Sequence, residues 1–537
     1  MFPSRRSVAV RGFIIHFIML SSVGIRNLAL CTQIFLQDSS ASPFTARFNK
    51  TANSLLEDLH IPGFSIAVVH GSETYAAGYG LATIPDVPAT ADTLYYPGST
   101  TKAFTAAAVS LLVDNSSFNW DTPLSTIIHD DFVLSDDWAT KHITVEDALS
   151  HRTGLPRHDF VYGGKEGTAQ SIVRRLRDLP LTAEPRTRFQ YCNLMFTTMG
   201  YVVEKVSSSS LGAFMREKIW QPLNMTNTYS SVDDALNSPR HFATGYAWKN
   251  DTSQFIDVPY TPVGEIGGAG FIISTVSDYA KWLRVMIYQS PPLSKSGHAA
   301  VISARTLVPM DLESMLRQGY IGDVTYGLGW ERFVYRGYLV ISHSGGIRGF
   351  GTLLLYVPQL EWGAVMMGNN VLQVSVAEQV VILGLLDDLL SVAEEDRFDY
   401  VELYRNQTAE KAKLLESAEE TLYPDLPSSR LPKLLPLTKY AGSYHHPAYG
   451  NVRLSAKGSG LHVTFNKTLV AGSDSYLDHI SGEYWIVTVV DSDTKEIEKK
   501  TKAEFRVGSN GHVMELGAQI DDELAALNRK TWFKKVE

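Results

Sequence analysis

A cluster of prolines divides the sequence into two parts with different patterns; they are Pro424, Pro427, Pro432 and Pro436. Before them, from about residue 42 to 390, helical stretches alternate with strand-like runs and glycine-rich turns. After Lys439 the chain consists of short runs rich in β-branched and aromatic residues. Since 537 residues also exceed the size of a single hydrophobic core, we expect two folded domains. The predicted boundaries are 42–390 for the first domain, 391–436 for a helical linker, and 437–537 for an all-β domain.

The first part mixes the two periodicities of secondary structure. Residues 64–70, FSIAVVH, predict a buried strand, and residues 73–80, ETYAAGYG, predict its partner across a tight turn. Residues 100–114 and 194–207 have apolar residues at helical spacing, and residues 338–370 predict adjacent antiparallel strands. We therefore expect an α+β fold, an antiparallel sheet flanked by helices, followed by a small all-β barrel or sandwich.

The amino terminus has the features of a signal peptide. Arg5, Arg6 and Arg11 precede an apolar run over residues 12–25, and Ala29 and Cys31 lie in a plausible cleavage site, so residues 1–31 are the predicted signal peptide. The run is short for a bilayer span, so we expect no stable membrane span, with an uncleaved anchor as the alternative. Asn-x-Ser/Thr glycosylation acceptors support export to the secretory lumen or beyond; they are Asn49, Asn115, Asn224, Asn250, Asn406 and Asn466.

Composition excludes several classes of function. The formal net charge is −9 and no basic stripe is found, so nucleic-acid binding is not expected. The two cysteines, Cys31 and Cys192, form neither a disulfide framework nor a metal-ligand spacing. The pair His445-His446 lacks further ligands at a convincing spacing, and we interpret it as a strand edge. With no phosphate-binding glycine loop in the sequence, we expect no cofactor and no metal.

Ser99-Thr100-Thr101-Lys102 is the first candidate for chemistry. It lies where a loop, YYPG, enters the predicted helix, so Ser99 and Lys102 share one helix face. A lysine held neutral by its surroundings can remove the proton of a serine hydroxyl without a histidine. The alternative is an ordinary helix cap, which serine also forms. The same spacing occurs at Ser492 and Lys495 in a charged turn, where we assign it no function.

Tyr191-Cys192-Asn193 is the second candidate. The tyrosine could pass protons to a leaving group, and the amide of Asn193 could orient the lysine and the substrate. The pattern Tyr-x-Asn also occurs at Tyr404 and Tyr449 and is uninformative by itself. Only Tyr191 precedes a helical run inside the domain that holds Ser99.

His343-Ser344-Gly345 is the third candidate, and we expect His343 at the end of a strand. Its side chain could bind a substrate carboxylate or carbonyl, and Gly345 and Gly346 would let the backbone approach closely and offer an N–H. A structural histidine before a tight turn is the alternative.

Taken together and in this order, the three motifs resemble those of the class C β-lactamase family, which includes penicillin-binding proteins, D-aminopeptidases and esterases. Residues 143–156, 267–283 and 326–330 are also similar to segments of this family. The resemblance spans about residues 44–390, and the terminal β domain resembles the lipocalin-like module that some members carry.

The resemblance implies a mechanism and a β-lactamase/transpeptidase-like fold. Ser99 would attack a carbonyl and become acylated, and Lys102 would accept its proton. Tyr191 would relay protons to the leaving group, and Asn193 would contact Lys102 and the substrate. The substrate would be a small-molecule ester, amide or peptide.

His343 departs from the lysine that β-lactamases proper carry in a Lys-Thr-Gly motif. This form is more frequent in the esterase and peptidase branches, so strong β-lactam hydrolysis is not expected. The resemblance further implies that the N–H groups of Ser99 and Gly346 form an oxyanion hole. Acyl transfer to another acceptor, and a non-catalytic binding protein of the same fold, are the alternatives to hydrolysis.

Overall fold

The computed structural model describes residues 41–162, 167–465 and 473–536. The predicted signal peptide and the predicted glycosylation acceptor Asn466 lie outside the described residues. Among the helices of the described ranges, none has both the length and the apolar character that a bilayer crossing requires.

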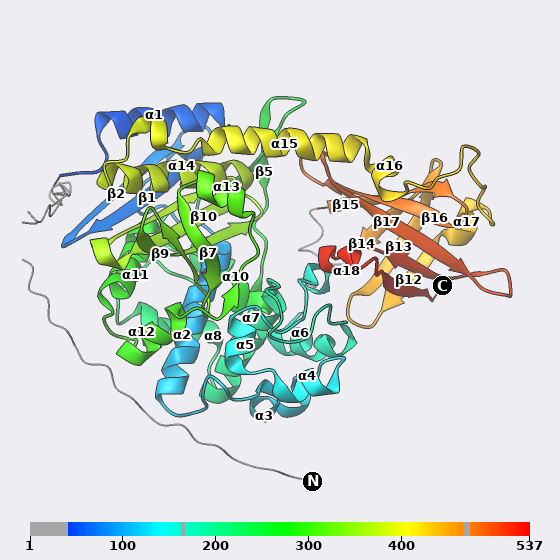
Figure 1. The fold of residues 1–537 in the computed structure, drawn as a ribbon, viewed down its shortest axis with the longest axis horizontal. Helices are drawn as coiled ribbons and strands as arrows, with labels where there is room; N and C mark the ends of the chain where they lie inside the picture. Colours follow the sequence, from blue (N-terminus) through cyan, green and yellow to red (C-terminus); the bar gives the residue numbers. More distant parts are fainter. Residues whose placement is uncertain (1–40, 163–166, 466–472, 537) are drawn as a thin grey trace, which may run out of the picture. The chain divides into compact units, whose positions relative to one another are not determined.

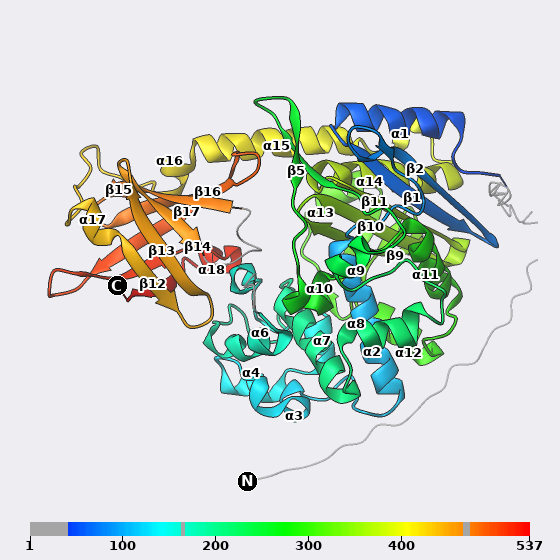
Figure 2. The same ribbon diagram turned by 180° about the vertical axis from the view of Figure 1, so that it is seen from behind.

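A nine-stranded antiparallel sheet forms the centre of the larger domain (Figures 1 and 2). Its strand order is β3-β2-β1-β11-β10-β9-β8-β7-β6. The predicted hairpin is present, because β1 pairs with β2 from His70↔Glu73 onward. The strands are β1 Gly63–His70, β2 Glu73–Thr83, β3 Val87–Pro88, β6 Thr306–Leu307, β7 Tyr320–Tyr326, β8 Glu331–Tyr335, β9 Tyr338–Ile347, β10 Phe350–Val357 and β11 Trp362–Gly368.

Side chains of the central strand β1 alternate between two hydrophobic cores. Phe64, Ile66 and Val68 contribute to one buried cluster, and Ala67 and Val69 contribute to the other. Such alternation follows from the two-residue period of a strand, and here both faces are covered by helices. The buried run FSIAVVH is therefore a strand with apolar residues on both faces, as its sequence predicts.

Helices cover both faces of the sheet. One core contains residues of α1 and α14, and the other contains residues of α2, α5, α7 and α11. The predicted helices 100–114 and 194–207 correspond to α2 and α7 within one residue. The helices of this domain are α1 Ala46–Asp58, α2 Thr101–Asp114, α3 Leu124–Ile127, α4 Asp137–His142, α5 Val145–Leu149, α6 Ala169–Arg175, α7 Asn193–Ser207, α8 Leu211–Met215, α9 Val232–Leu236, α10 Gly267–Gly270, α11 Val276–Tyr288, α12 Lys295–Ile302, α13 Leu312–Arg317 and α14 Leu372–Leu389.

Two helices, α15 Tyr400–Glu416 and α16 Ala418–Leu422, fall within the stretch expected to be a helical linker. A separate two-stranded sheet pairs β4 Gly245–Lys249 with β5 Gln254–Val258. Two short helices accompany the terminal part of the chain, α17 Leu437–Tyr440 and α18 Asp522–Ala526.

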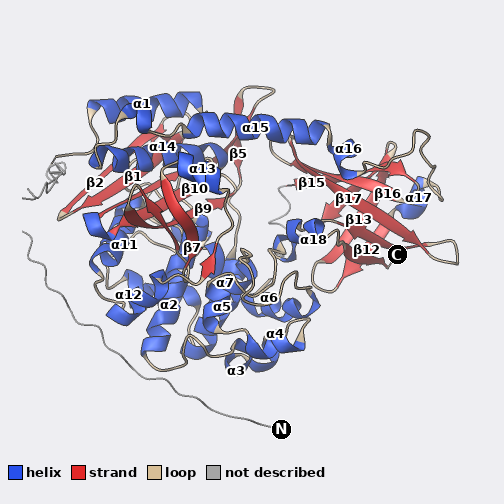
Figure 3. Cartoon of the chain, viewed as in Figure 1, coloured by secondary structure: helices blue, strands red, loops and turns tan. Residues whose placement is uncertain are grey.

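The terminal β domain is a closed eight-stranded barrel, drawn in Figure 3 as a group of red strands. Closure comes from pairing of the first strand with the last, at Tyr444↔Lys535. The expected fold, an antiparallel sheet flanked by helices plus a β barrel, is confirmed. The barrel strands are β12 Gly442–His446, β13 Gly450–Lys457, β14 Gly460–Phe465, β15 Ser473–Ser481, β16 Tyr484–Asp491, β17 Ile497–Val507, β18 Val513–Ala518 and β19 Thr531–Lys535.

The barrel encloses a cavity of about 270 Å³. Apolar side chains such as Leu477 and Phe533 form most of its wall, and Phe160 of the larger domain contributes to the lining. Eight strands leave an interior that side chains or one small ligand can fill.

Candidate active site

Ser99 lies in a short 3-10 helix, Gly98–Thr100, that leads directly into α2. Gly98 has a φ of +53°, which glycine adopts without steric cost. A Cβ on Gly98 would lie 2.9 Å from the carbonyl oxygen of Gly346, and a Cβ on Gly345 would lie 2.0 Å from that of Pro97. Glycines at these positions therefore let β9 approach the backbone beside Ser99.

Lys102 sits on the first turn of α2 with its side chain directed at Ser99. Its Nζ lies 2.9 Å from Ser99 Oγ and 3.0 Å from the carbonyl oxygen of Ala269, and the residue is 0% exposed. In this arrangement Nζ donates to both oxygens. A neutral amine at the same position would still donate to Ala269 and would have a lone pair to accept the hydroxyl proton of Ser99. The geometry therefore matches that of a serine with its proton acceptor.

The charge state of Lys102 follows from its surroundings. Burial is the largest of the causes that hold the pKa of Lys102 well below 10.5. The positive charge of Arg157 lowers this pKa further, while Asp159 and Cys192 oppose the shift. A lowered pKa is what a lysine needs to act as a base near neutral pH.

Tyr191 faces both residues from the turn before α7. Its side chain is hydrogen-bonded to Ser99, and its ring centroid lies 4.7 Å from Lys102 Nζ. Burial raises the pKa of the phenol, with the hydrogen bond to Ser99 and the charge of Arg157 acting in the opposite direction. The phenol is therefore a proton donor at neutral pH, suited to a leaving group.

The turn that carries Tyr191 is held by His151. The imidazole Nδ1 of His151 accepts a 3.0 Å hydrogen bond from the backbone N–H of Cys192, and its ring lies 4.3 Å from the ring of Tyr191. Burial and the charge of Lys102 hold the pKa of His151 well below 6.5, so the ring is neutral and able to accept this bond.

Asn193 is the first residue of α7 and points its amide at a carboxylate. Its Nδ2 donates to Asp159 Oδ1 at 3.1 Å and to the hydroxyl of Tyr162 at 3.3 Å. The same carboxylate pairs with Arg157 Nε at 2.6 Å. The hydrogen-bond partners of Lys102 in this structure are Ser99 and Ala269. The contact between Asn193 and Lys102 that the resemblance implies therefore stays a prediction.

His343 lies inside strand β9 and not at a strand end as expected. The strand continues to Ile347 because Gly345 and Gly346 pair with Thr352 and Gly351 of β10. The imidazole Nδ1 donates to the carbonyl oxygen of Ser344 at 2.6 Å, and Nε2 accepts from the hydroxyl of Tyr326 at 2.9 Å.

The electrostatics of His343 oppose a cationic role. Burial and the charge of Lys102 lower its pKa to about 3. A neutral ring with both nitrogens hydrogen-bonded cannot attract a carboxylate as a cation would. Substrate binding by His343, Gly345 and Gly346 stays a prediction, and for His343 it would have to proceed through a neutral ring.

Several residues of the site were not predicted individually from the sequence. His151, Arg157 and Asp159 lie in or beside the segment 143–156 that resembles the family, and Ala269 and Tyr326 lie in two of the other similar segments. Position in these segments was the only signal for them. Apart from the ion pair between Arg157 and Asp159, each contacts a partner that is distant in the sequence.

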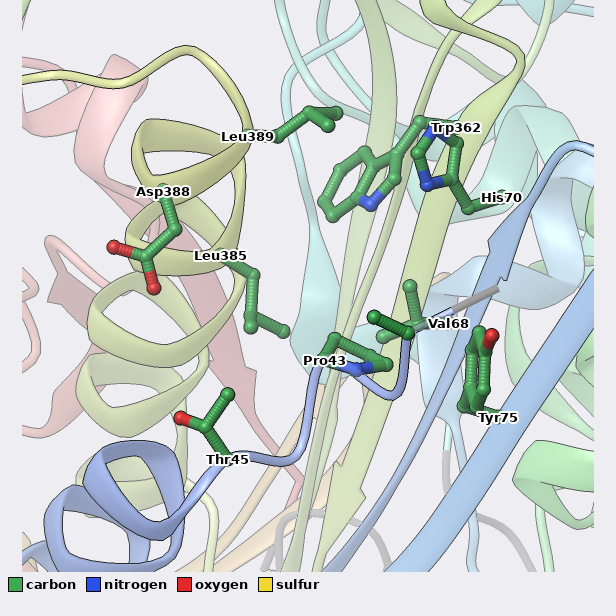
Figure 4. A pocket seen from close by; sticks show the side chains of 10 residues that line it. Pro43, Thr45, Val68, His70, Tyr75, Trp362, Leu385, Asp388 and Leu389 are labelled. Atoms are coloured by element: carbon green, nitrogen blue, oxygen red, sulfur yellow. The ribbon is translucent and has the colours of Figure 1, made fainter. Parts of the chain in front are cut away.

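A small cavity lies apart from these residues (Figure 4). It measures about 40 Å³ and is lined by side chains such as Pro43, His70, Trp362 and Leu385. A space of this size holds at most a few water molecules, and it shares no lining residue with the site around Ser99. In the described residues, no cluster of three or more His, Cys, Asp or Glu has an arrangement that could hold a metal ion.

The fold places this chain in the class of serine hydrolases with a β-lactamase-like fold, and Ser99, Lys102 and Tyr191 lie together within it. A family model described as Beta-lactamase matches residues 48–379. A second model, described as a domain of unknown function (DUF3471), matches residues 427–535. The chain belongs to the β-lactamase family, and the resemblance drawn from the sequence is confirmed.

Comparisons with individual proteins agree with this assignment. An unguisins hydrolase from Aspergillus campestris is 38% identical over 510 residues, which are 93% of this chain and 93% of that protein. The structure of an octameric penicillin-binding protein homologue from Pyrococcus abyssi matches with a TM-score of 0.59 and 20% identity, over 91% of this chain and 99% of that one. A class C β-lactamase from Rhodobacter sphaeroides matches with a TM-score of 0.52 and 20% identity, over 64% of this chain and 100% of that one.

Proposed function

We propose that this protein hydrolyses an ester or small amide through an acyl-enzyme on Ser99, and that unguisins are the first substrates to test. The observation that supports this proposal most directly is the buried amine of Lys102, 2.9 Å from Ser99 Oγ. Similarity to an unguisins hydrolase along 93% of both chains supports the choice of substrate.

In the proposed first step, Ser99 Oγ attacks the carbonyl carbon while its proton passes to Lys102 Nζ. The negative charge that develops on the carbonyl oxygen faces the N–H groups of Ser99 and Gly346. Tyr191 then donates its phenolic proton to the leaving group, and the C–O or C–N bond to that group breaks. The lysine ammonium returns a proton to the phenolate, which restores both groups.

In the second step a water molecule attacks the acyl-enzyme. Its proton passes to Lys102 Nζ, the bond between Ser99 Oγ and the acyl carbon breaks, and the serine recovers its proton from the lysine ammonium. Overall, one water is consumed and an acid is released together with an alcohol or an amine.

Purified full-length chain and its Ser99→Ala variant would be incubated with unguisins, and the products followed by mass spectrometry. We expect the wild-type protein alone to give products that have gained the mass of one water. Products from both proteins, or from neither, would contradict the proposal. Added alcohols would test the alternative of acyl transfer, since a transferase would form the corresponding ester.

We also propose that the chain is exported and glycosylated. Five of the six predicted acceptors lie in the described residues and are exposed; they are Asn49, Asn115, Asn224, Asn250 and Asn406. Exposure is a requirement for a stable surface glycan. Treatment of the protein from a eukaryotic host with an N-glycosidase should lower its apparent mass, and an unchanged mass would contradict the proposal.

A further inference from the structure

The loop that carries Arg157 and Asp159 is bonded to the barrel through the residue between them. The backbone N–H of His158 donates to Asp521 Oδ2 at 2.9 Å, and the hydroxyl of Tyr449 lies 2.6 Å from His158 Nδ1. On its other side, His158 Nε2 lies 3.1 Å from the carbonyl oxygen of Pro180. A carbonyl can only accept, so Nε2 carries the proton and Nδ1 accepts from the phenol of Tyr449.

These bonds hold the backbone of His158 in an unusual conformation. Its φ is +48°, in the left-handed region that residues other than glycine rarely adopt. Such a conformation persists only where the surroundings fix it. His158 is 1% exposed, Tyr449 is 2% exposed and Asp521 is 5% exposed, so the three groups have no competing contact with bulk water.

The two neighbours of His158 point to the catalytic groups instead. The guanidinium carbon of Arg157 lies 5.1 Å from the ring centroid of Tyr191, and Asp159 accepts from Asn193 at 3.1 Å. Arg157 and Asp159 pair with each other at 2.6 Å. A rotation of the backbone at His158 would therefore move both charges relative to the site.

We propose that the barrel is a positioning element of the active site: Tyr449 and Asp521 fix His158, and His158 fixes Arg157 and Asp159 against Tyr191 and Asn193. This inference rests on the proposed function, because it assigns these contacts to the acylation step. It also assigns a role to Tyr449, whose Tyr-x-Asn pattern is otherwise uninformative.

The test compares two barrel tyrosines that each make a buried hydrogen bond. Tyr449→Phe removes the bond to His158 together with the hydrogen bond between Tyr449 and Thr531. Tyr444→Phe is the matched control, because its hydroxyl donates to the carbonyl oxygen of Tyr440 in α17 at 2.6 Å. Phosphonylation of Ser99 by a fluorophosphonate, in which an Oγ–P bond forms and fluoride leaves, stands in for acylation in this test and would be followed by stopped flow in the full chain. We expect Tyr449→Phe to slow acylation about tenfold, since small displacements of groups near the reacting atoms cost rates of this order or more. Tyr444→Phe should acylate at the wild-type rate.

A double-mutant cycle shows whether the effect passes through Arg157. If it does, Tyr449→Phe combined with Arg157→Ala should be no slower than Arg157→Ala alone. Additive losses, or a wild-type acylation rate in Tyr449→Phe, would overturn the positioning role. Should Tyr449→Phe fail to fold, Asp521→Asn serves instead, because it keeps the Oδ1 that caps α18 and replaces the oxygen that accepts from His158.

One readout is independent of activity. The ¹⁵N–¹H resonance of Arg157 Nε, in protein labelled on arginine, should shift in Tyr449→Phe and stay unchanged in Tyr444→Phe. An unshifted resonance in Tyr449→Phe would overturn the positioning role even if acylation were slow. If fluorophosphonates do not label the wild-type protein, the proposed function is overturned instead. The Arg157 resonance would then decide the positioning role by itself.

Discussion

The same four-residue spacing, serine and then lysine three positions later, occurs twice in this molecule in opposite environments. Lys102 is 0% exposed on the first turn of α2. The side chain of Lys495 is 58% exposed in the turn between β16 and β17, and its Nζ lies 3.3 Å from Asp474 Oδ2. The first lysine contacts a hydroxyl and a carbonyl, whereas the second pairs with a carboxylate at the surface.

The difference shows that burial and helix geometry, and not the motif, create a candidate base. A helix places residues three apart on one face, so Lys102 reaches Ser99 from its own helix. In the second turn, Asp491 accepts the N–H groups of Asp493 and Thr494, and the φ of Lys495 is +65°. The turn thus satisfies its own backbone and directs its lysine to solvent.

Removal of the two serine hydroxyls is expected to give the largest contrast. Ser99→Ala should lower turnover by roughly 10⁶-fold, as loss of the nucleophile does in other serine hydrolases, because no oxygen remains to form the acyl-enzyme. Intact-protein mass spectrometry after treatment with a fluorophosphonate would measure the label. Ser492→Ala is the matched control and should be labelled like the wild type. Equal labelling of both variants would exclude Ser99 as the nucleophile.

Removal of the two lysine amines should give the next largest difference in acylation rate between the two Ser-x-x-Lys sites. Lys102→Met keeps the volume and removes the proton acceptor, so acylation should slow by about 10²–10⁴-fold, the usual range for a general base. Lys495→Met should leave the rate unchanged. Stopped-flow acylation measures both, and a wild-type rate for Lys102→Met would show that another group takes the proton of Ser99.

Tyr191→Phe tests the third member of the site and should have a smaller effect. The variant keeps the ring that packs against Lys102 and loses the phenolic proton donor. We expect kcat to fall by about 10²-fold for substrates with poor leaving groups. An activated ester, whose leaving group needs no proton, should lose much less. A loss that is equal for both kinds of substrate would argue against proton donation by Tyr191.

The features of the site that could be predicted from the sequence are local ones. Ser99 and Lys102 belong to one helix start, and Tyr191 precedes a helix whose pattern is clear. The short β runs after Lys439 likewise predict a small barrel or sandwich, and the structure shows the barrel, in which each strand pairs with its neighbour in the sequence. In these cases the geometry follows from spacing along a regular element.

The features that could not be predicted depend on loops and long-range contacts. His151 and His158 both adopt left-handed backbone conformations, which cannot be predicted from the sequence because neither residue is a glycine. Asn193 is hydrogen-bonded to Asp159, and His158 is hydrogen-bonded to Tyr449, which is 291 residues away in the sequence. The position of His343 within β9 also depends on its partner strand, since two glycines after it would ordinarily favour a turn.

The last prediction concerns stability, where the two lysines should also differ. Since the pKa of Lys102 in the folded protein lies well below 10.5, the unfolded chain binds an extra proton between these two values. Wild-type stability should therefore rise with pH across that window, and Lys102→Met should remove this dependence. At neutral pH the variant should gain roughly 1 kcal/mol in the free energy of unfolding, the scale typical of substitutions that relieve a functional site.

Urea denaturation at several pH values would measure this gain for Lys102→Met, with Lys495→Met as the exposed control. The gain should become smaller as pH rises towards 10.5, because the unfolded chain then loses the same proton. A Lys102→Met protein that is less stable than the wild type at neutral pH, or a gain that does not change with pH, would mean that burial of the amine carries no cost. Lys102 would then be an ordinary packed side chain, and its difference from Lys495 would be one of exposure alone.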